Sequence, residues 1–324
     1  MSRSSPSRRS RGFTLVEILV VVAIIVILMA ILIPVAMGAI SRARNAAIGF
    51  ELKELKSAVE EYKLKMGDYP PSMGGPPAQW LPANRYSTVV ERHLLRCYPK
   101  IDPSHKNFFY NAIAPRLGND EALVFWLTLI ANDPRYPFKN FIADNNSPPN
   151  VFFAPPPGSP SGATGVYPGP YTRYAFYEFD ERRLRDFDSD TFPCYVSAYA
   201  KDTPYVYFDS RTYWMHMNSA TAFAGVCQPY MNYQKVQQTI SNTNLPPNGA
   251  FVNPNTYQIH CAGQDGLFGG VADAVNPGNN YSWNNNWQTI VKTFPNMTGN
   301  TNEEDSDNMA DFTEGRKLID HRAP

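Results

Sequence analysis

Residues 12–33 read GFTLVEILVVVAIIVILMAILI, and this stretch decides how the rest of the chain is organised. From Ile18 to Ile33 it has sixteen residues without a polar side chain, and counted from Phe13 it has twenty-one residues. About 20 such residues cross a bilayer as a helix, and basic residues before the helix stay in the cytoplasm. The sequence therefore predicts a single-pass helix with everything after residue 33 outside the cytoplasm. The preceding basic residues are Arg3, Arg8, Arg9 and Arg11.

Two other interpretations share these features. A secretory signal peptide also has a basic start and an apolar centre, although the apolar centre here is longer than usual. A plain uncleaved membrane anchor is the second. Neither accounts for Glu17, since a carboxylate in hydrocarbon costs roughly 2–3 kcal/mol or more and usually has a partner. At the membrane edge, however, such a side chain can snorkel to water.

Residues 11–17 (RGFTLVE) resemble the processing site of type IV pilins and type II secretion pseudopilins. The resemblance implies that a prepilin peptidase cuts between Gly12 and Phe13 and that Phe13 becomes the N-methylated first residue. Glu17 is then the family's acidic fifth position. Cleavage creates an ammonium group at Phe13, and Glu17 of one subunit can neutralise that of the next, because buried charges are tolerated as pairs.

The resemblance also implies where the protein works and with what. It implies a single-pass protein of the bacterial inner membrane with a periplasmic or extracytoplasmic C-terminal domain. Its partners would be the prepilin peptidase, further copies of itself in a filament, other pseudopilins and an assembly platform in the inner membrane. The expected organisation is a leader at 1–12, an assembly helix at 13–33, an amphipathic helix at 34–68 and a globular domain at 69–324, with a loop-rich insertion at about 71–255.

A helical pattern continues after Pro34, a residue that removes one helix hydrogen bond and kinks the rod. Apolar residues recur at spacings of four, three, four, three and four, which places them on one face of a helix. Gly67 can cap this helix, and the prolines at 70–71 prevent its continuation. We expect the apolar stripe to pack on the chain's own domain, with a coiled coil as the alternative. The stripe is Ile48, Leu52, Leu55, Val59, Tyr62 and Met66.

The globular domain is predicted to be of the α+β class: the long, half-transmembrane N-terminal helix packs on a small antiparallel sheet with large loop insertions. A short helix is expected at 87–97. A buried helix is expected at 121–131, capped by Asn119 or Asp120. Alternating aromatic and small residues predict strands. The predicted strands are 173–179, 195–200, 204–208 and 256–262, with another helix around 233–240.

Composition excludes some functions and leaves the cysteine chemistry open. The net charge is zero, so no basic surface argues for nucleic acid. No GxSxG, HExxH, P-loop or GxGxxG motif occurs, and no enzyme activity is expected. Four cysteines outside the cytoplasm permit two disulfides, and buried free thiols are an equal alternative. They are Cys97, Cys194, Cys227 and Cys261.

Two acidic segments are candidates for calcium binding. Residues 261–269 (CAGQDGLFG) and 307–312 (DNMADF) resemble the C-terminal calcium loop of major pseudopilins, although roughly forty residues separate the two halves. By that resemblance Asp265 and Asp307 would be ligands, with Asp305 in reserve, and the alternative is a solvated acidic tail. Residues 186–190 (DFDSD) form the second candidate. Thr191 and Ser197 exclude an EF-hand there, so a looser calcium turn or a charged surface turn remains. Its acids are Asp186, Asp188 and Asp190.

We therefore expect a pseudopilin: a structural filament subunit that supports protein secretion. The alternative is a minor or tip-located pilin-like subunit whose enlarged aromatic domain is a binding or adhesin module. A membrane-tethered hydrolase would be a third class, but it needs a catalytic set of residues that the sequence does not offer. The copy number per filament separates the first two.

Overall fold

The structure is a computed structural model of the 324-residue chain. The chain divides into two compact units, Met1–Arg44 and Asn45–Pro324, and helix α1 (Leu15–Met66) runs from the first into the second. The residues that the structure describes are 14–73, 85–138, 175–187, 192–200, 202–213, 227–232, 234–235, 250–268, 293–294 and 307–321.

In the first unit, α1 is apolar and exposed. Its most apolar stretch has a mean hydropathy of 3.5 and is 0% buried, and α1 is the one helix in the described residues long and apolar enough to cross a membrane. Pro34 lies inside the helix, which is continuous through it. The membrane-length helix predicted from the sequence is thus present as a helix.

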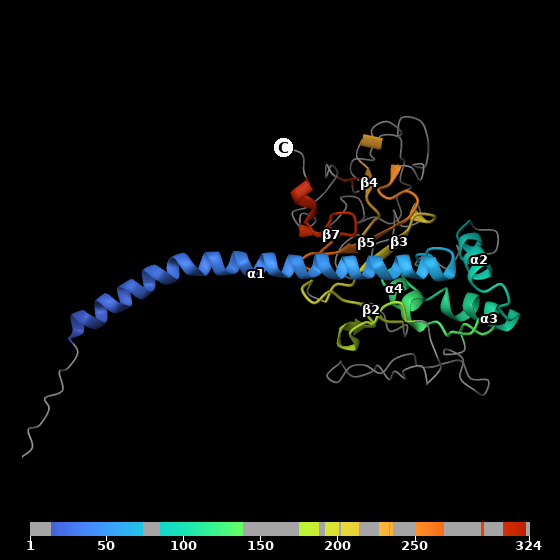
Figure 1. The fold of residues 1–324 in the computed structure, drawn as a ribbon, viewed down its shortest axis with the longest axis horizontal. Coiled ribbons are helices and arrows are strands. Elements are labelled where there is room, and N and C mark those ends of the chain that lie inside the picture. The colour runs from blue at the N-terminus through green and yellow to red at the C-terminus, as the bar shows by residue number, and fades with distance from the viewer. Residues whose placement is uncertain are drawn as a thin grey trace, which may run out of the picture. The chain divides into compact units, whose positions relative to one another are not determined.

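In the globular unit, one face of α1 packs against the domain (Figure 1). Five members of the predicted stripe are buried, and Met66 packs against the core while partly exposed. The helix ends at Gly67 as predicted. Gly67 has a φ of +85°, and its N–H donates to the carbonyl of Lys63 at 2.8 Å. The stripe therefore serves the chain's own core. The buried residues of α1 are Ile48, Gly49, Leu52, Leu55, Ala58, Val59 and Tyr62.

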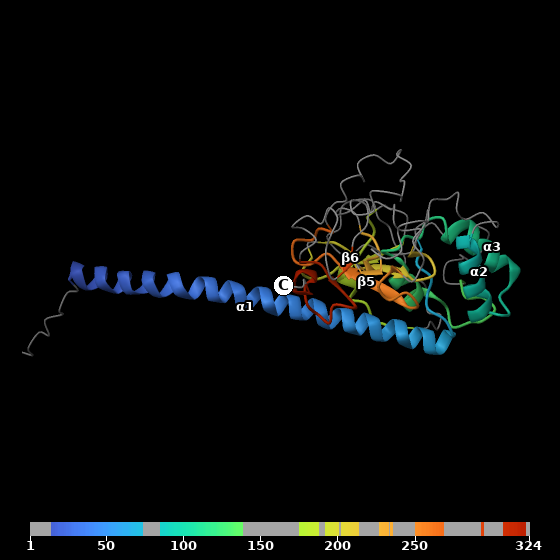
Figure 2. The same cartoon turned by 90° about the horizontal axis from the view of Figure 1, so that it is seen from above.

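Two short helices lie side by side at the C-terminal end of α1 (Figures 1 and 2). Helix α2 (Arg85–Cys97) corresponds to the helix predicted at 87–97. Helix α3 (Pro103–Phe108) was not predicted, although its start has the expected signals: Asp102 accepts from the N–H of Ser104, and proline occupies the first turn. A π-helical turn, Phe109–Ile113, continues it.

The helix predicted at 121–131 is shorter and differently capped. It consists of α4 (Ala122–Val124) and a π-helical turn at Phe125–Leu129, and it is buried as expected. The predicted caps were wrong, because Glu121 is the N-cap and no side chain caps the helix. The carbonyl of Asn119 is already engaged, accepting from the N–H of Tyr207 at 3.0 Å.

The central sheet has three antiparallel strands in the order β3–β5–β7. Strands β3 (Val206–Asp209) and β5 (Tyr257–Cys261) fall within a residue or two of the predicted strands. The edge strand β7 (Met309–Ala310) was not predicted, because it lies within an acidic tail. Two smaller sheets are antiparallel β1–β2 (Leu184–Arg185 and Cys194–Tyr195) and parallel β4–β6 (Met231–Asn232 and Thr293–Phe294).

Two predicted strands were wrong in whole or part. The described part of 173–179 forms no strand, because Phe176 donates its N–H to the carbonyl of Leu127 and so joins the π-helical turn. The strand predicted at 195–200 ends early, since the chain turns back and the N–H of Thr203 donates to the carbonyl of Ala200. The helix predicted around 233–240 lies almost entirely outside the described residues.

Candidate functional site

The start of α1 forms a reciprocal capping box. The N–H and the hydroxyl of Thr14 both donate to Glu17 Oε2 at 2.8 Å, and the N–H of Glu17 lies 3.2 Å from Thr14 Oγ1. Such a box satisfies N–H groups that the first helical turn leaves without partners. Glu17 therefore has a partner within its own chain. The predicted cleavage pair, Gly12 and Phe13, lies outside the described residues.

In the globular unit, three acidic residues on or just after α1 hold the domain to the helix. The first is Glu51, whose carboxylate receives Arg183 in a two-bond pair at 2.5 and 2.8 Å. The hydroxyls of Tyr195 and Tyr205 donate to the same carboxylate at 2.8 and 2.5 Å. The Glu51 and Arg183 side chains are only 14% and 20% exposed. Bidentate geometry in such a site is strong and directional.

The second acid is Glu60, which accepts from two tyrosines. The hydroxyl of Tyr257 on β5 lies 3.0 Å from Glu60 Oε1, and that of Tyr69 lies 3.1 Å from Oε2. The two tyrosine rings meet edge to face with centroids 5.0 Å apart. One helix carboxylate thus connects the chain leaving α1 to the central sheet.

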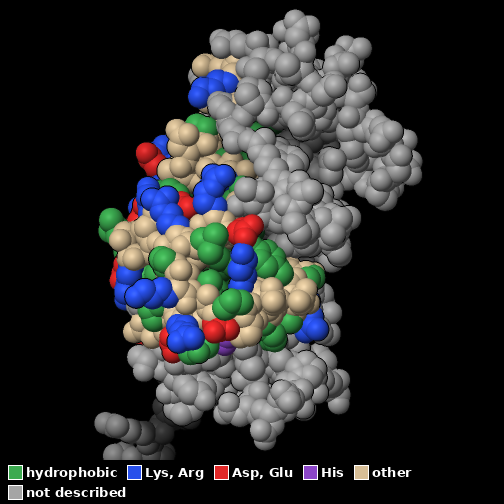
Figure 3. All heavy atoms as spheres, turned by 90° about the vertical axis from the view of Figure 1, so that its right-hand side faces the viewer, with side chains coloured by type: hydrophobic (Ala, Val, Ile, Leu, Met, Phe, Trp, Pro, Cys, Tyr) green, Lys and Arg blue, Asp and Glu red, His purple; other side chains and the backbone are tan. Residues whose placement is uncertain are grey.

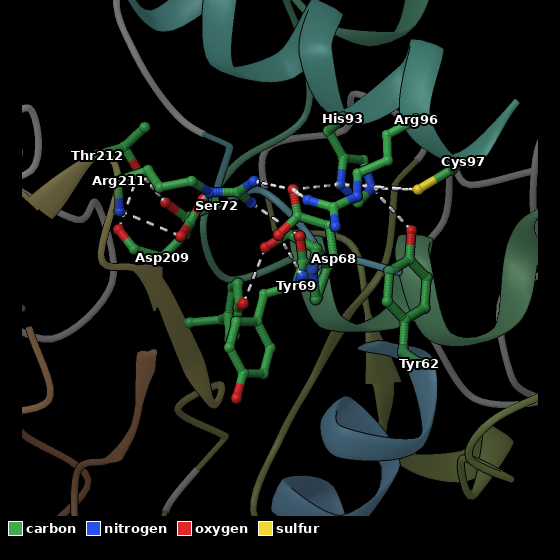
Figure 4. Close-up of polar contacts among 12 residues, drawn as sticks. Tyr62, Asp68, Tyr69, Ser72, His93, Arg96, Cys97, Asp209, Arg211 and Thr212 are labelled. Atoms are coloured by element: carbon green, nitrogen blue, oxygen red, sulfur yellow. Dashed lines mark hydrogen bonds and ion pairs between the residues drawn. The ribbon is translucent and has the colours of Figure 1, made fainter. Parts of the chain in front are cut away.

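The third acid is Asp68, which binds Arg211 at 2.5 Å (Figure 4). Arg211 also reaches the carbonyl of Tyr69 at 2.8 Å and Asp209 Oδ2 at 2.7 Å. Asp209 is 1% exposed, and burial raises its pKa to about 6 despite the nearby arginine. The helix exit is therefore fixed to the end of β3 by one shared arginine.

Beside this network lies a buried histidine–cysteine pair that superficially resembles a catalytic dyad (Figure 4). His93 shares a 2.9 Å hydrogen bond with the hydroxyl of Tyr62, and its Nε2 lies 3.5 Å from Cys97 Sγ. Burial, with the arginines nearby, lowers the pKa of His93, and burial raises the pKa of Cys97 to about 12. A reactive cysteine needs the opposite shift. The pair is therefore a packing element of the core.

No disulfide joins the four cysteines, all of which lie in the described part of the chain. Burial raises the pKa of Cys194 and also that of Cys261, the latter to about 12. Of the two alternatives left open by the sequence, the structure has free thiols, three of them buried and that of Cys97 partly exposed.

The two C-terminal acidic segments lie next to each other in the structure. Asp307 Oδ2 accepts the N–H groups of Gln264 and Asp265 at 2.8 and 3.2 Å, across more than forty positions. Asp265 Oδ1 accepts the N–H of Leu267 at 2.8 Å and closes its own turn. Asp307 Oδ1 is buried without a hydrogen-bond partner in the structure. Gly263 adopts a φ of +69°, and a Cβ there would stand 2.4 Å from the carbonyl oxygen of Asp307. Asp305 lies outside the described residues.

The second acidic segment is only partly described. Asp186 follows β1, and its charge lies near Cys194 together with those of Asp120 and Glu121. Asp188 and Asp190 lie outside the described residues. Among the residues that are described, no group of three or more His, Cys, Asp or Glu side chains is arranged to hold a metal ion.

The end of the globular unit that carries α2 and α3 shows charges of both signs. Figure 3 shows Lys and Arg side chains interspersed with acidic and apolar ones among the described residues of this face. Several basic side chains there are paired, such as Lys106 with Glu91 and Arg135 with Asp102. This face therefore offers no continuous patch of one sign in the part that the structure describes.

Comparison with known proteins finds a known motif in the N-terminal segment. The model of the prokaryotic N-terminal methylation motif matches residues 7–33. By this motif the chain is similar to pilins and pseudopilins. The match includes Gly12, Phe13 and Glu17, the residues on which the resemblance was based.

Curated relatives match a part of the chain. Type II secretion system core protein G of Klebsiella pneumoniae is 37% identical over 68 residues, which are 21% of this chain and 49% of the relative. The type IV wide pilus major component PilA4 of Thermus thermophilus is 39% identical over 62 residues, 19% of this chain and 47% of the relative. Protein G of Pseudomonas aeruginosa is 37% identical over 68 residues, 21% of this chain and 48% of the relative.

The chain thus spans about half the length of the curated relatives it matches. Because the same 68 residues are 21% of this chain and 49% of the Klebsiella protein, this pilin-like chain is more than twice as long. No solved structure matches it.

Proposed function

We propose that this pilin-like chain is a pseudopilin: a structural subunit that is cleaved after Gly12, N-methylated at Phe13 and assembled through α1 into a filament that supports protein secretion. The observation that carries the proposal is the methylation motif at residues 7–33 leading directly into an exposed apolar helix. A prepilin peptidase, other pseudopilins and an inner-membrane assembly platform are its proposed partners.

The helix start supports this function physically. A carboxylate in an apolar helix is costly unless it has partners. Glu17 has them in Thr14, so a single subunit can remain in the membrane before assembly. In a filament the same carboxylate would face the ammonium group created at Phe13 of the next subunit, which is a stronger partner than a hydroxyl. The exchange of partners would favour assembly only after cleavage.

Processing is tested by the intact mass and N-terminal sequence of the full chain from its native membrane. We expect N-methyl-Phe13 as the first residue, and Gly12→Val should leave the leader attached. Gly38→Val is the matched control, because a Cβ at Gly38 meets nothing within 4 Å. A start after residue 36 would mean ordinary secretion, and an intact N-terminus would mean a plain anchor. Either result overturns the proposal.

Assembly is tested by replacing Glu17. Glu17→Ala should be cleaved but should not enter filaments, whereas Glu54→Ala, which removes an exposed carboxylate further along α1, should do both. Crosslinking of membranes followed by immunoblotting measures the assembled fraction. Wild-type levels of crosslinked Glu17→Ala would refute the role of Glu17.

We also propose that the turn held by Asp265 and Asp307 binds calcium. Calcium prefers carboxylate and carbonyl oxygens. The buried and unpartnered Oδ1 of Asp307 is the observation that fits a cation. When bound, the ion would neutralise that oxygen, while the other oxygen of Asp307 holds the backbone of residues 264–265.

A second candidate function is a binding or adhesin module at the filament tip. The size of this chain relative to the Klebsiella protein favours it, since a repeated filament subunit does not need so large a domain. Quantitative immunoblotting of isolated filaments separates the two functions: many copies per filament support the structural subunit, and one or a few support the tip.

A further inference from the structure

A cysteine and a histidine face each other on the side of the central sheet that points away from α1. Tyr257 of β5 reaches α1 through its hydroxyl, and side chains alternate along a strand, so His260, three residues later, lies on the other face. Its Nδ1 is 3.6 Å from Cys227 Sγ. His260 is 2% exposed and Cys227 1%, and both line a small cavity that has no room for a water molecule. The pair is therefore shielded from water.

Gln258 fixes which nitrogen of His260 carries the proton. The amide nitrogen of Gln258 donates to the carbonyls of Tyr230 and Val252 at 2.9 and 2.8 Å, which sets the orientation of its side chain. Its Oε1 accepts the N–H of Tyr230 at 2.7 Å and lies 2.9 Å from His260 Nε2. An amide oxygen can only accept, so Nε2 is the donor and Nδ1 keeps its lone pair. That lone pair faces the thiol of Cys227.

This arrangement is the one that a metal-binding histidine takes. Such a histidine usually donates its other ring N–H to an oxygen, which fixes the tautomer and the direction of the ligand nitrogen. For an ion of the size of zinc, bonds of about 2.3 Å to sulfur and about 2.1 Å to nitrogen at a tetrahedral angle hold the two ligand atoms about 3.6 Å apart. The observed separation of 3.6 Å therefore allows one ion to bind both atoms with little movement.

The surroundings favour a soft monovalent ion, Cu⁺, over Zn²⁺, Ca²⁺ or Mg²⁺. One thiolate neutralises one positive charge, and a buried net charge is costly. Structural zinc takes four ligands, whereas in the described part of the chain no third His, Cys, Asp or Glu joins this pair. Calcium needs many oxygen ligands and magnesium keeps several waters, which the cavity does not admit. Thiolate and imidazole, in contrast, both suit copper.

The other cysteine–histidine pair of the globular unit is not equivalent. His93 Nε2, which lies 3.5 Å from Cys97 Sγ, also shares the 2.9 Å hydrogen bond with the hydroxyl of Tyr62. The positive charges of Arg96 and Arg211 act on His93 and would repel a cation. The pair at Cys97 is therefore a matched control for the pair at Cys227.

We propose that Cys227 and His260 bind one Cu⁺ ion and that Gln258 is the positioning residue that directs His260 Nδ1 toward it. The copper–sulfur bond replaces the S–H bond, and the thiol proton is released to solvent. Neither sulfur nor copper changes its oxidation state. The bound ion would join the segment before β4 to β5, and its binding does not depend on filament assembly.

The test uses the full chain, purified from its native membrane in detergent with a reducing agent, and titrates it with Cu⁺ in competition with the chelator bicinchoninate. We expect one tightly bound ion per chain, with one sulfur and one nitrogen neighbour in its X-ray absorption spectrum. Cys227→Ser should lose this ion, because a serine hydroxyl can keep the hydrogen bond to His260 but is a poor ligand for a soft metal. Cys97→Ser should bind copper as the wild type does.

Two measurements keep the test independent of folding. Near-UV circular dichroism should show the wild-type fold in Cys227→Ser, and the absorption spectrum of the wild-type chain reports the ligands without any substitution. The proposal is overturned if the wild-type chain binds no more copper than Cys227→Ser, or if Cys97→Ser loses the ion. A spectrum with sulfur but no nitrogen neighbour, or binding of Zn²⁺ alone but not of Cu⁺, overturns it as well.

Discussion

Glu51 should contribute more to the stability of the globular unit than any exposed acid on α1. Its carboxylate binds Arg183 and two tyrosine hydroxyls, and both charged side chains are at most 20% exposed. Breaking a fully buried pair costs roughly 3–5 kcal/mol, whereas an exposed pair contributes about 1 kcal/mol or less. With partial solvent access, we expect Glu51→Ala to lower the free energy of unfolding by about 3 kcal/mol.

The loss can be measured by thermal unfolding of the full chain in detergent, followed by near-UV circular dichroism. For a domain of this size 1 kcal/mol shifts Tm by about 2–3 °C, so Glu51→Ala should lower Tm by about 6–9 °C. Glu54→Ala is the matched control, because Glu54 is an exposed acid on the same helix, and its Tm should change by less than about 2 °C.

A double-mutant cycle isolates the pair. Arg183→Met should be destabilising alone, but Glu51→Ala/Arg183→Met should cost clearly less than the sum, because neither charge is then left buried and alone. Additive effects, or a Glu51→Ala chain as stable as Glu54→Ala, would refute the claim that this ion pair holds the domain to α1.

Three further outcomes follow from the geometry. Gly49→Ala should lower the free energy of unfolding in urea by about 1–3 kcal/mol, because the added Cβ would meet the Gly315 backbone. Gly38→Ala, where the Cβ meets nothing within 4 Å, should leave the stability unchanged or raise it by up to about 1 kcal/mol. Equal effects of the two substitutions would contradict the close contact at Gly49. Burial raises the pKa of Asp311 from 3.8 to about 7, so protonated Asp311 favours the folded state. This contribution to stability is present below about pH 4 and is lost as the pH rises through 7. The urea midpoint of the wild-type chain should therefore fall between pH 5 and 8, and that of Asp311→Asn should depend less on pH. If calcium binds the C-terminal turn, a chelator should lower Tm in the wild-type chain but not in Asp307→Asn, and an unchanged wild-type Tm would count against the site.

The sequence predicted the fold best where the pattern of residues within a single helix or strand determines its structure. The apolar spacing from Ile48 to Tyr62 correctly gave the buried face of α1, and Gly67 correctly marked its end. Strands β3 and β5 were found because both are buried runs rich in aromatic and β-branched residues. These signals are local, so no knowledge of the fold was needed to read them.

The contacts that hold the domain were invisible in the sequence. Glu51 lies among alternating acids and lysines on α1, and nothing local separates it from Glu54. Its partner Arg183 is 132 positions away, in a segment whose strand is two residues long. Strand β7 could not be predicted because it also depends on a contact between distant segments. Its two residues lie in an acidic tail and form a strand only by pairing with β5. The hydrogen bonds from Asp307 to the backbone of residues 264–265 likewise join segments more than forty positions apart, and only the family resemblance, which carries tertiary information, pointed to both segments.

The two units differ in what they still require from their surroundings. In the globular unit, arginine and tyrosine side chains of the same chain already bind the buried acidic residues on and just after α1. This part of α1 is therefore held in place without a second protein. In the first unit, the large apolar side chains from Leu15 to Ile40 are exposed in the structure. A continuous apolar surface of this extent needs lipid or protein around it. Because lipid tails and neighbouring apolar helices satisfy it almost equally, the proposed passage of α1 from membrane to filament would have little hydrophobic cost, and the polar pairs of Glu17 would decide its direction.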